Sequence, residues 1–409
     1  MKHYWFWIQP FTFIFQTKKE VLFYNSETGY SWMERLTSSI KRIVEKLQKH
    51  ENSYCISLSE TDLNDKKINQ LVGELRNSFS GDLIEQDRTK GKPFVFKPKL
   101  RLINDVEIIR KEKDRGIGDS VLQFISEVFI YLNSACSQNC PDCSRYYKQF
   151  FYCRSQKDEE DTLNLNKLIR FLEKIETAGV MKIVFSGGNI FSSSKMHLLI
   201  ENLSERRFRK IIQFNYLNYP DDNLLRDFRT YVQFEILVHF PVQYEILEKT
   251  LILLDETNTN WKFIVRSEEE YLAAAQIIKM NDLNAEIKPF YNGQNIDFFK
   301  KYVYVEKEDL KLTTAKKSIF ARGKINENDF GKLTIMPDGK VYANLYHAPL
   351  GTIDDDIREL IYNEMDRGTS WRRIRNMNPC CDCVYQWLCP SPSNYELAIG
   401  KPNLCHIKP

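Results

Sequence analysis

The sequence predicts an α/β protein of three parts: an α+β domain over residues 1–115, a partial barrel of six βα units over 116–300, and a cysteine-rich domain over 301–409. Two observations predict this division. Strand-like and helix-like segments alternate through the middle part, and repeated βα units form a parallel sheet with right-handed crossovers. In addition, nine of the ten cysteines fall into two groups, one early in the middle part and one near the end.

Apolar runs and helical periodicity define the elements of the first domain. They predict strands at 11–15, 20–24 and 94–96, and helices at 40–47 and 68–75. The aromatic stretch 4–15 lacks a small-residue cleavage site and is interrupted by Gln9 and Pro10, so we interpret it as a strand of the fold and not as a signal peptide.

The middle part alternates between the two kinds of element. Strands are expected within 121–132 and at 181–185, 210–216, 234–240, 261–265 and 285–290, with helices at 163–175, 196–203, 244–254 and 271–280. In such folds the chemistry gathers at the carboxyl ends of the strands, so residues that follow the strands are the candidate site residues. In the last part, strands at 332–335 and 341–343 flank the turn signal Pro337-Asp338-Gly339, and a helix is expected at 357–364.

Composition excludes several classes of partner. The net charge of +3 gives no large electrostatic footprint for nucleic acid or membrane. No run of 18 apolar residues is present, so we expect no transmembrane helix and a cytoplasmic protein. In that reducing compartment ten cysteines favour metal binding or catalysis over disulfides, although Cys55 stands alone and is expected to be a buried apolar residue.

The first cysteine group is Cys136, Cys140 and Cys143, a C-x3-C-x2-C pattern in a short loop after a predicted strand. Three thiolates on one loop suit three irons of a [4Fe–4S] cluster and leave the fourth iron open. Zinc is the alternative, but a structural zinc needs a fourth protein ligand, and the following segment offers only Cys153 at an unusual distance.

This loop, together with Ser186-Gly187-Gly188-Asn189 after the second strand of the predicted barrel, resembles the radical S-adenosylmethionine (SAM) superfamily. The resemblance implies that the open iron binds SAM, that the reduced cluster cleaves it to a 5′-deoxyadenosyl radical, and that this radical takes a hydrogen from the substrate. It also implies that the Gly-Gly turn contacts the SAM amine. Two residues depart from the family pattern: Asp142 stands where an aromatic residue is usual, and Asn189 replaces the usual Glu.

Three further residues are singled out only by their positions at the ends of later strands. Asn215 and Arg266 are candidate SAM contacts, Arg266 through a bidentate pair with the SAM carboxylate, and an ordinary structural role is equally compatible with each. His239 is expected to be a buried structural histidine more readily than a catalyst.

The second cysteine group, Cys380-x2-Cys383-x5-Cys389 followed by Cys405, resembles the second half of the SPASM domain of radical SAM peptide maturases. The resemblance implies one auxiliary [4Fe–4S] cluster on these four cysteines, with a structural zinc as the alternative and Cys381 pointing away. The family's other auxiliary cluster lacks its ligands here: Asn344 stands five positions after the hairpin glycine, Ser393 stands four after Cys389, and no cysteine lies between residues 154 and 379.

The first domain resembles the units with which such maturases grip a leader peptide by β-augmentation, although a structural cap is an equal alternative. The whole chain resembles Bacteroidetes SPASM proteins called pseudo-radical-SAM, through Tyr4-Trp5-Phe6, the Gly-Gly turn and Cys389-Pro390-Ser391. These resemblances imply a maturase of a ribosomally made precursor peptide, served by a flavodoxin- or ferredoxin-type reductant and forming a thioether, a carbon–carbon cross-link or an epimer. A non-catalytic protein that binds a peptide or a partner maturase is the alternative, and a zinc-stabilised binding protein is a third.

Overall fold

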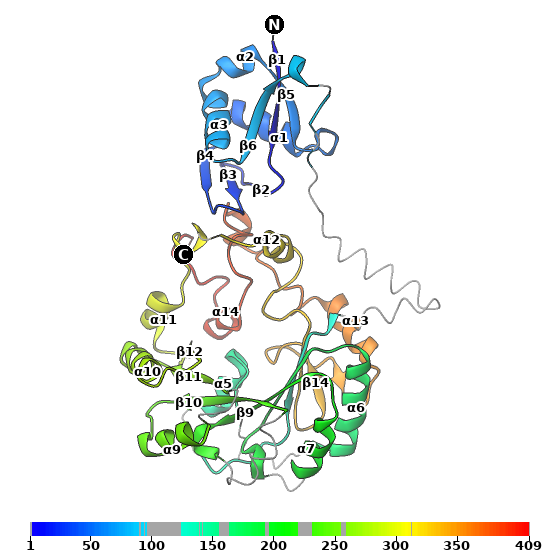
Figure 1. Cartoon of the computed structure of the whole chain (residues 1–409), viewed down its shortest axis with the longest axis vertical. Helices are drawn as coiled ribbons and strands as arrows, with labels where there is room; N and C mark the ends of the chain where they lie inside the picture. The colour runs from blue at the N-terminus through cyan, green and yellow to red at the C-terminus, as the bar shows by residue number, and fades with distance from the viewer. Residues whose placement is uncertain are drawn as a thin grey trace.

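The computed structural model describes residues 2–89, 91–93, 95, 124–138, 140, 142–154, 163–192, 196–219, 231–254, 259–311 and 313–408. These residues form two three-stranded sheets near the amino terminus and one nine-stranded sheet in the rest of the chain. Figure 1 shows the amino-terminal sheets at one end of the molecule and the large sheet at the other.

The first small sheet has β1 (His3–Ile8) at its centre, with β5 (Cys55–Ser59) and β6 (Gly81–Glu85) antiparallel on either side. Helices α1 (Ser38–Gln48) and α3 (Lys66–Asn77) bury their apolar stripes against it, which confirms both predicted helices, and α2 (Glu60–Asn64) leads into α3. Cys55 is fully buried, as expected for an apolar residue.

The second small sheet contains β2 (Thr12–Gln16), β3 (Glu20–Asn25) and β4 (Ser31–Arg35), all antiparallel. The strands predicted at 11–15 and 20–24 are confirmed as β2 and β3, whereas the interpretation of 4–15 as one strand is wrong. The strand is interrupted at Gln9 and Pro10, because proline has no N–H to donate to a neighbouring strand. As a result, β1 and β2 belong to different sheets. The strand predicted at 94–96 falls partly on residues outside those described.

The large sheet is built around six parallel strands that follow one another in chain order. They are β7 (Glu127–Tyr131), β8 (Lys182–Ser186), β9 (Arg209–Asn215), β10 (Gln233–His239), β11 (Thr259–Val265) and β12 (Ala285–Pro289). Beside β7 the sheet continues with β13 (Lys332–Ile335), which is parallel, and then with β14 (Lys340–Tyr342) and β15 (Gly351–Thr352), which are antiparallel. The predicted parallel sheet is confirmed; within the described residues it has free edges at β12 and β15, so its strands do not close into a full barrel.

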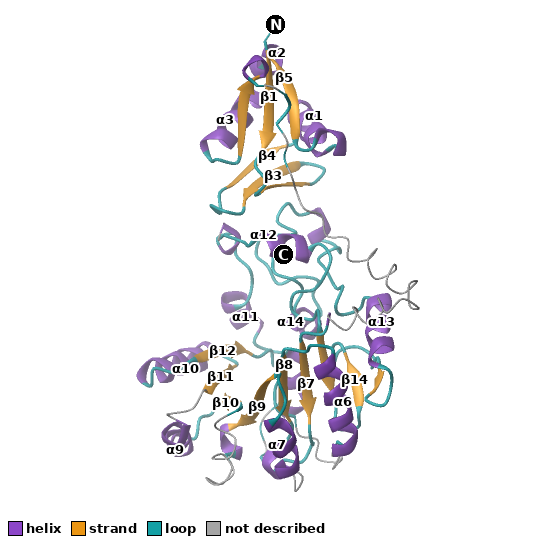
Figure 2. Cartoon of the chain, turned by 45° about the vertical axis from the view of Figure 1, so that its right-hand side comes forward, coloured by secondary structure: helices purple, strands orange, loops and turns teal. Residues whose placement is uncertain are grey.

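Helices cover one face of this sheet and give it the main core. These are α6 (Leu165–Thr177), α7 (Met196–Ser204), α9 (Tyr244–Leu254), α10 (Glu268–Met280) and α13 (Ile357–Arg367). Figure 2 shows several of them as purple helices along the outside of the orange strands. Since side chains alternate between the two faces of a strand, every second strand residue points to the opposite face, where the candidate sites lie.

That opposite face carries α5 (Cys143–Gln149) and the extended residues that follow it. Tyr146, Tyr152 and Cys153 pack there against the strand residues Leu237 and Ile264 and against Phe290, which follows β12. Figure 1 shows α5 between the sheet and α14 (Asn394–Ile399), with which it is in contact.

The carboxyl-terminal part links the large sheet to the amino-terminal domain. It contains α11 (Ile296–Tyr302), α12 (Lys316–Arg322) and α14. Phe13, Leu22 and Tyr24 of β2 and β3 share one apolar cluster with residues of this part, Leu310, Ile319, Val384, Tyr385, Leu388 and Cys389. The amino-terminal domain therefore packs against the part of the chain that carries Cys389 of the second cysteine group. None of the helices in the described residues is long and apolar enough to cross a membrane.

Candidate functional site

The first cysteine loop begins directly after the carboxyl end of β7, beside the Gly-Gly turn that follows β8. The Gly188 N–H donates to the Asn133 carbonyl at 3.1 Å, and the Asn189 N–H donates to the Ala135 carbonyl at 2.6 Å. The Asn133 side chain donates in turn to the Asn189 carbonyl at 2.8 Å. The loop and the turn, whose Asn133 and Gly188 are 55 residues apart in sequence, are thus held together by hydrogen bonds in both directions.

This close approach explains the two glycines. A Cβ atom on Gly187 would lie 2.5 Å from Asn133 Oδ1, and one on Gly188 would lie 2.2 Å from the Ala135 carbonyl oxygen. Real Cβ atoms do not come so near, so only glycine lets the cysteine loop reach the turn. The Gly188 and Asn189 N–H groups are used inside the protein, and a SAM contact at this turn, which stays a prediction, has to use other atoms.

The other predicted SAM contacts also have protein partners. Ser186 is fully buried and its hydroxyl donates to Gln213 at 3.0 Å. Asn215 lies 2.9 Å from His239 Nδ1, and Arg266 pairs with Glu270 at 2.7 Å and donates to the Phe240 carbonyl at 3.0 Å. These partners hold each side chain in place within the protein.

His239 is buried, in agreement with its expected structural role. Burial lowers its pKa to about 4, and the nearby Arg266 guanidinium contributes to that shift. At neutral pH the imidazole is therefore uncharged, and it shares a hydrogen bond with Asn215.

Four thiols lie near one another at this end of the sheet. Burial, together with the charges of Cys143 and Cys136, raises the pKa of Cys140 to about 12. The fourth thiol is Cys153, only 5% exposed, whose pKa is also raised by burial and by Cys143, Cys140 and Cys136. The next N–H along the chain, that of Arg154, donates to the Gly187 carbonyl at 2.9 Å and so holds Cys153 beside the same turn.

In the sequence Cys153 lies ten residues after Cys143, outside the C-x3-C-x2-C pattern. The chain turns back after α5, and this places Cys153 near the other three thiols. As they stand, no three His, Cys, Asp or Glu side chains of the described residues converge closely enough to hold a metal ion. Cys136, for example, accepts a hydrogen bond from Asn218 at 3.5 Å. The soft sulfur donors nevertheless fit a thiolate-ligated cluster in their chemistry, and binding requires them to turn toward one another.

The second cysteine group surrounds one small cavity. Cys380, Cys383, Cys389 and Cys405 all line it, together with Arg375 and Lys408. The Cys405 sulfur accepts from the Lys408 N–H at 3.3 Å and from the Asn403 amide at 3.6 Å. Burial raises the pKa of Cys389 to about 12, while Arg375 opposes that rise. Four soft donors with N–H and guanidinium groups around them suit either an iron–sulfur cluster or zinc.

Cys381 differs from its neighbours. It is exposed, and its thiol lies 2.9 Å from the Asn378 side-chain oxygen. It does not line the cavity that the other four share.

Asn344, which stands where the SPASM pattern has a cysteine, belongs to a polar network. The Asn344 amide donates to Asp329 at 3.3 Å and to Asn394 at 2.7 Å, and Arg373 approaches Asp329 at 3.4 Å. Asn394 follows Ser393 and donates to the Lys148 carbonyl at 3.0 Å. Asn344 and Asp329 are both buried, so amide, carboxylate and guanidinium groups satisfy one another at these positions.

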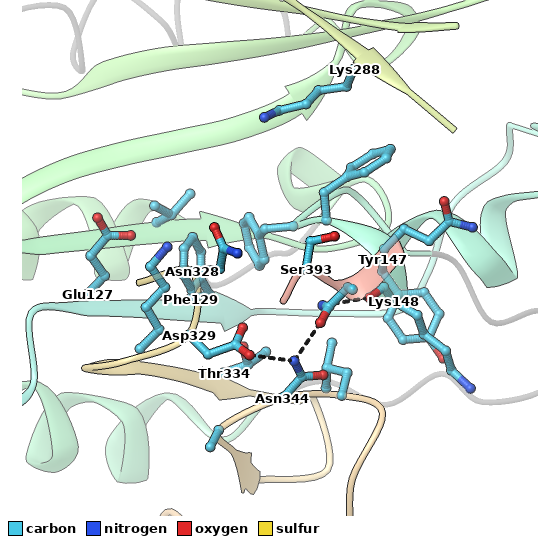
Figure 3. A pocket seen from close by; sticks show the side chains of 18 of the residues that line it. Glu127, Phe129, Tyr147, Lys148, Lys288, Asn328, Asp329, Thr334, Asn344 and Ser393 are labelled. Carbon is cyan, nitrogen blue, oxygen red and sulfur yellow. Dashed lines mark hydrogen bonds between the residues drawn. The ribbon is translucent and has the colours of Figure 1, made fainter. Parts of the chain in front are cut away.

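A separate cavity of about 420 Å³ lies on the same face of the sheet but at its other end. Glu127, Lys182 and Lys332, each the first residue of its strand, line it, as do the last residues of α5, whereas the cysteine loop follows the strands' far ends. Figure 3 shows side chains from the strands and the carboxyl-terminal part converging on it. Helix α5 and its aromatic cluster stand between the cavity and the first cysteine group.

No family model matches the chain, and no curated protein matches its sequence. Among solved structures, one that is similar is HydG, described as a maturase of the [FeFe]-hydrogenase, with 13% sequence identity and a TM-score of 0.31. The similar region covers 61% of this chain and 63% of that chain. A likeness of this size carries no argument about function, so the site has to be judged from its own residues.

Proposed function

We propose that this chain is a radical SAM enzyme that modifies a ribosomally made peptide. The observation that carries the proposal is the placement of the C-x3-C-x2-C loop. It follows the first of six consecutive parallel strands and is hydrogen-bonded to a Gly-Gly turn after the second. Chemistry in parallel α/β sheets gathers at this end of the strands.

In this proposal Cys136, Cys140 and Cys143 would hold a [4Fe–4S] cluster. With SAM bound, that cluster would supply the electron for cleavage of SAM. The chain's own groups do the positioning. The two glycines let the loop lie against β8, and Asn215 and Arg266 stand at the ends of neighbouring strands as candidate SAM contacts. The buried aromatic cluster around Tyr146 and Tyr152 encloses Cys153.

The remaining parts receive supporting roles. Cys380, Cys383, Cys389 and Cys405 would hold one auxiliary [4Fe–4S] cluster, and a flavodoxin- or ferredoxin-type partner in the cytoplasm would supply electrons. In the first domain, β5 and β6 each keep one edge that pairs with no other described strand. A leader peptide can add a strand to such an edge, and the modified core peptide would carry a thioether, a carbon–carbon cross-link or an epimerised residue.

The test is SAM cleavage by the anaerobically reconstituted protein with dithionite, with candidate peptides present. The decisive variant changes Cys136, Cys140 and Cys143 to Ala, and Cys381→Ala, which alters an exposed thiol outside both groups, is the matched control. We expect 5′-deoxyadenosine from the wild type and the control and none from the triple variant. Equal product from all three proteins would refute the assignment of the loop.

A second candidate, a non-catalytic protein that binds a peptide or a partner maturase, is favoured by one observation. Helix α5 and residues 150–153 fill the sheet face beside the cysteine loop, where a substrate would have to enter. Iron bound without any 5′-deoxyadenosine, together with retained peptide binding, would select this second candidate. Zinc in both cysteine groups would instead select a zinc-stabilised binding protein.

A further inference from the structure

The cavity at the amino-terminal ends of the strands has a surplus of positive charge. Five lysines line it (Lys148, Lys182, Lys262, Lys288 and Lys332) against three carboxylates (Glu127, Glu235 and Asp329), a surplus of two. Its volume of about 420 Å³ lies within the range of ligand-binding pockets. No cysteine lines it, so neither cluster proposal accounts for it.

The three carboxylates are already neutralised by groups of the protein. Glu127 pairs with Lys182 at 2.8 Å and Glu235 pairs with Lys262 at 2.8 Å. Asp329 receives the Asn344 amide and Arg373, as described above. The lining carboxylates therefore have no need of an external cation.

The amide side chains in the wall are also occupied. Asn344 donates to two neighbours and accepts from the Tyr346 N–H at 3.0 Å, while Asn394 bridges Asn344 and the Lys148 carbonyl. These bonds fix the wall but leave little hydrogen-bonding capacity for a ligand.

Of the other three lysines, Lys288 pairs with Glu286 at 2.5 Å, which leaves two ammonium groups. Lys148 and Lys332 are both partly buried, and neither lies within ion-pair distance of a carboxylate of the described residues, although the charge of Lys332 acts on Asp329 from further away. They belong to different elements, Lys148 to the end of α5 and Lys332 to the start of β13. A partly buried ammonium without a counter-ion favours an anion as its partner.

The rest of the lining indicates which anion. Phe129 and Phe151, whose ring centres are 4.4 Å apart, form an apolar wall with Phe150 and Tyr395. No arginine is among the described residues that line the cavity, and the first turn of α14 is capped by its own Ser393, so the forked donors and free N–H groups that suit phosphate are lacking. We propose that this cavity binds a carboxylate attached to a carbon skeleton, held between Lys148 and Lys332 and packed on the phenylalanines.

The experiment is isothermal titration of the purified full-length chain, which needs no SAM and so reports independently of the proposed function. The probes are acetyl-Gly-Glu-Gly-amide, its Gln counterpart, succinate and inorganic phosphate. The variants are Lys148→Met and Lys332→Met, with Lys279→Met, an exposed lysine on α10, as the matched control. Thermal unfolding checks that each variant is folded.

We expect the Glu peptide to bind and the Gln peptide to fail, and each cavity variant to weaken binding by about tenfold while Lys279→Met changes nothing. Glu127→Gln removes the partner of Lys182 and frees a third ammonium group, so it should bind the Glu peptide more tightly. A merely structural role for these lysines would not produce that gain.

The other probes distinguish the source of the carboxylate and can overturn the proposal. Succinate binding that equals or exceeds that of the Glu peptide supports the carboxylate site and indicates a free small acid as its source, whereas peptide binding without succinate binding indicates an acidic peptide residue. Phosphate binding as tight as the Glu peptide would overturn the choice of carboxylate. Equal binding of the Glu and Gln peptides, or binding unaffected by both lysine variants, would overturn the proposal.

Discussion

Replacing Gly188 by Ala tests whether the cysteine loop lies against the Gly-Gly turn. The new Cβ would stand 2.2 Å from the Ala135 carbonyl oxygen, a backbone atom that cannot move without the loop. The loop has to withdraw, and the hydrogen bonds from the Gly188 and Asn189 N–H groups, at 3.1 and 2.6 Å, are then lost or stretched.

The expected cost follows from these contacts. Two backbone hydrogen bonds contribute about 1 kcal/mol each, and residual overpacking adds about 1–3 kcal/mol, so the local opening free energy should fall by about 3–5 kcal/mol. Since each 1.4 kcal/mol is a factor of ten, amide hydrogen exchange over residues 185–192 should accelerate by about a hundredfold or more. The same variant should retain less iron after anaerobic reconstitution.

Gly73→Ala is the matched control. Gly73 lies inside α3, and a Cβ there would meet nothing within 4 Å. Alanine should stabilise this helix by about 0.5–1 kcal/mol, and exchange within α3 should slow slightly. If exchange over residues 185–192 in Gly188→Ala stays within threefold of the wild type, the loop does not contact the turn and the reasoning is refuted.

Three further predictions concern buried polar groups and thiols. Because the pKa of His239 is lowered to about 4, the unfolded chain binds a proton that the folded chain does not as pH falls from 6.5 to 4. The free energy of unfolding should therefore drop by about 3 kcal/mol over that window. Urea titrations at pH 7 and 4.5 should show that this part of the drop is absent in His239→Gln. An equal drop in the wild type and the variant would contradict the assignment. Asn344→Leu deprives the buried Asp329 of a donor and should cost about 1–3 kcal/mol, with an unchanged melting temperature as the contrary result. Cys383→Ser should lower the metal content of the purified protein and Cys381→Ser should not, because only Cys383 lines the shared cavity; equal losses would contradict this.

Much of the fold follows from local patterns in the sequence. Every strand and helix that it predicted in the middle part is present, because apolar periodicity follows directly from burial on one helix face or on both faces of a parallel sheet. In the first domain it missed β4, β5 and β6, and it took the aromatic stretch that contains β1 and β2 as one strand.

Some of the candidate site residues were also predictable from sequence alone, and others were not. Local spacing was sufficient to select Cys136, Cys140 and Cys143, because thiolates on one loop are neighbours whatever the rest of the chain does. The four cysteines of the second group were also selected from spacing, although their common cavity depends on the return of the chain at Cys405.

Tertiary structure decided what sequence spacing cannot encode. It brought Cys153 back to the first loop, it engaged the Gly188 and Asn189 N–H groups inside the protein, and it gathered lysines from separate strands and from α5 around one cavity. Each of these results depends on which distant segments the sheet places side by side. A residue's own neighbours in the chain carry no record of that pairing, because it is set by the packing of whole elements around the core.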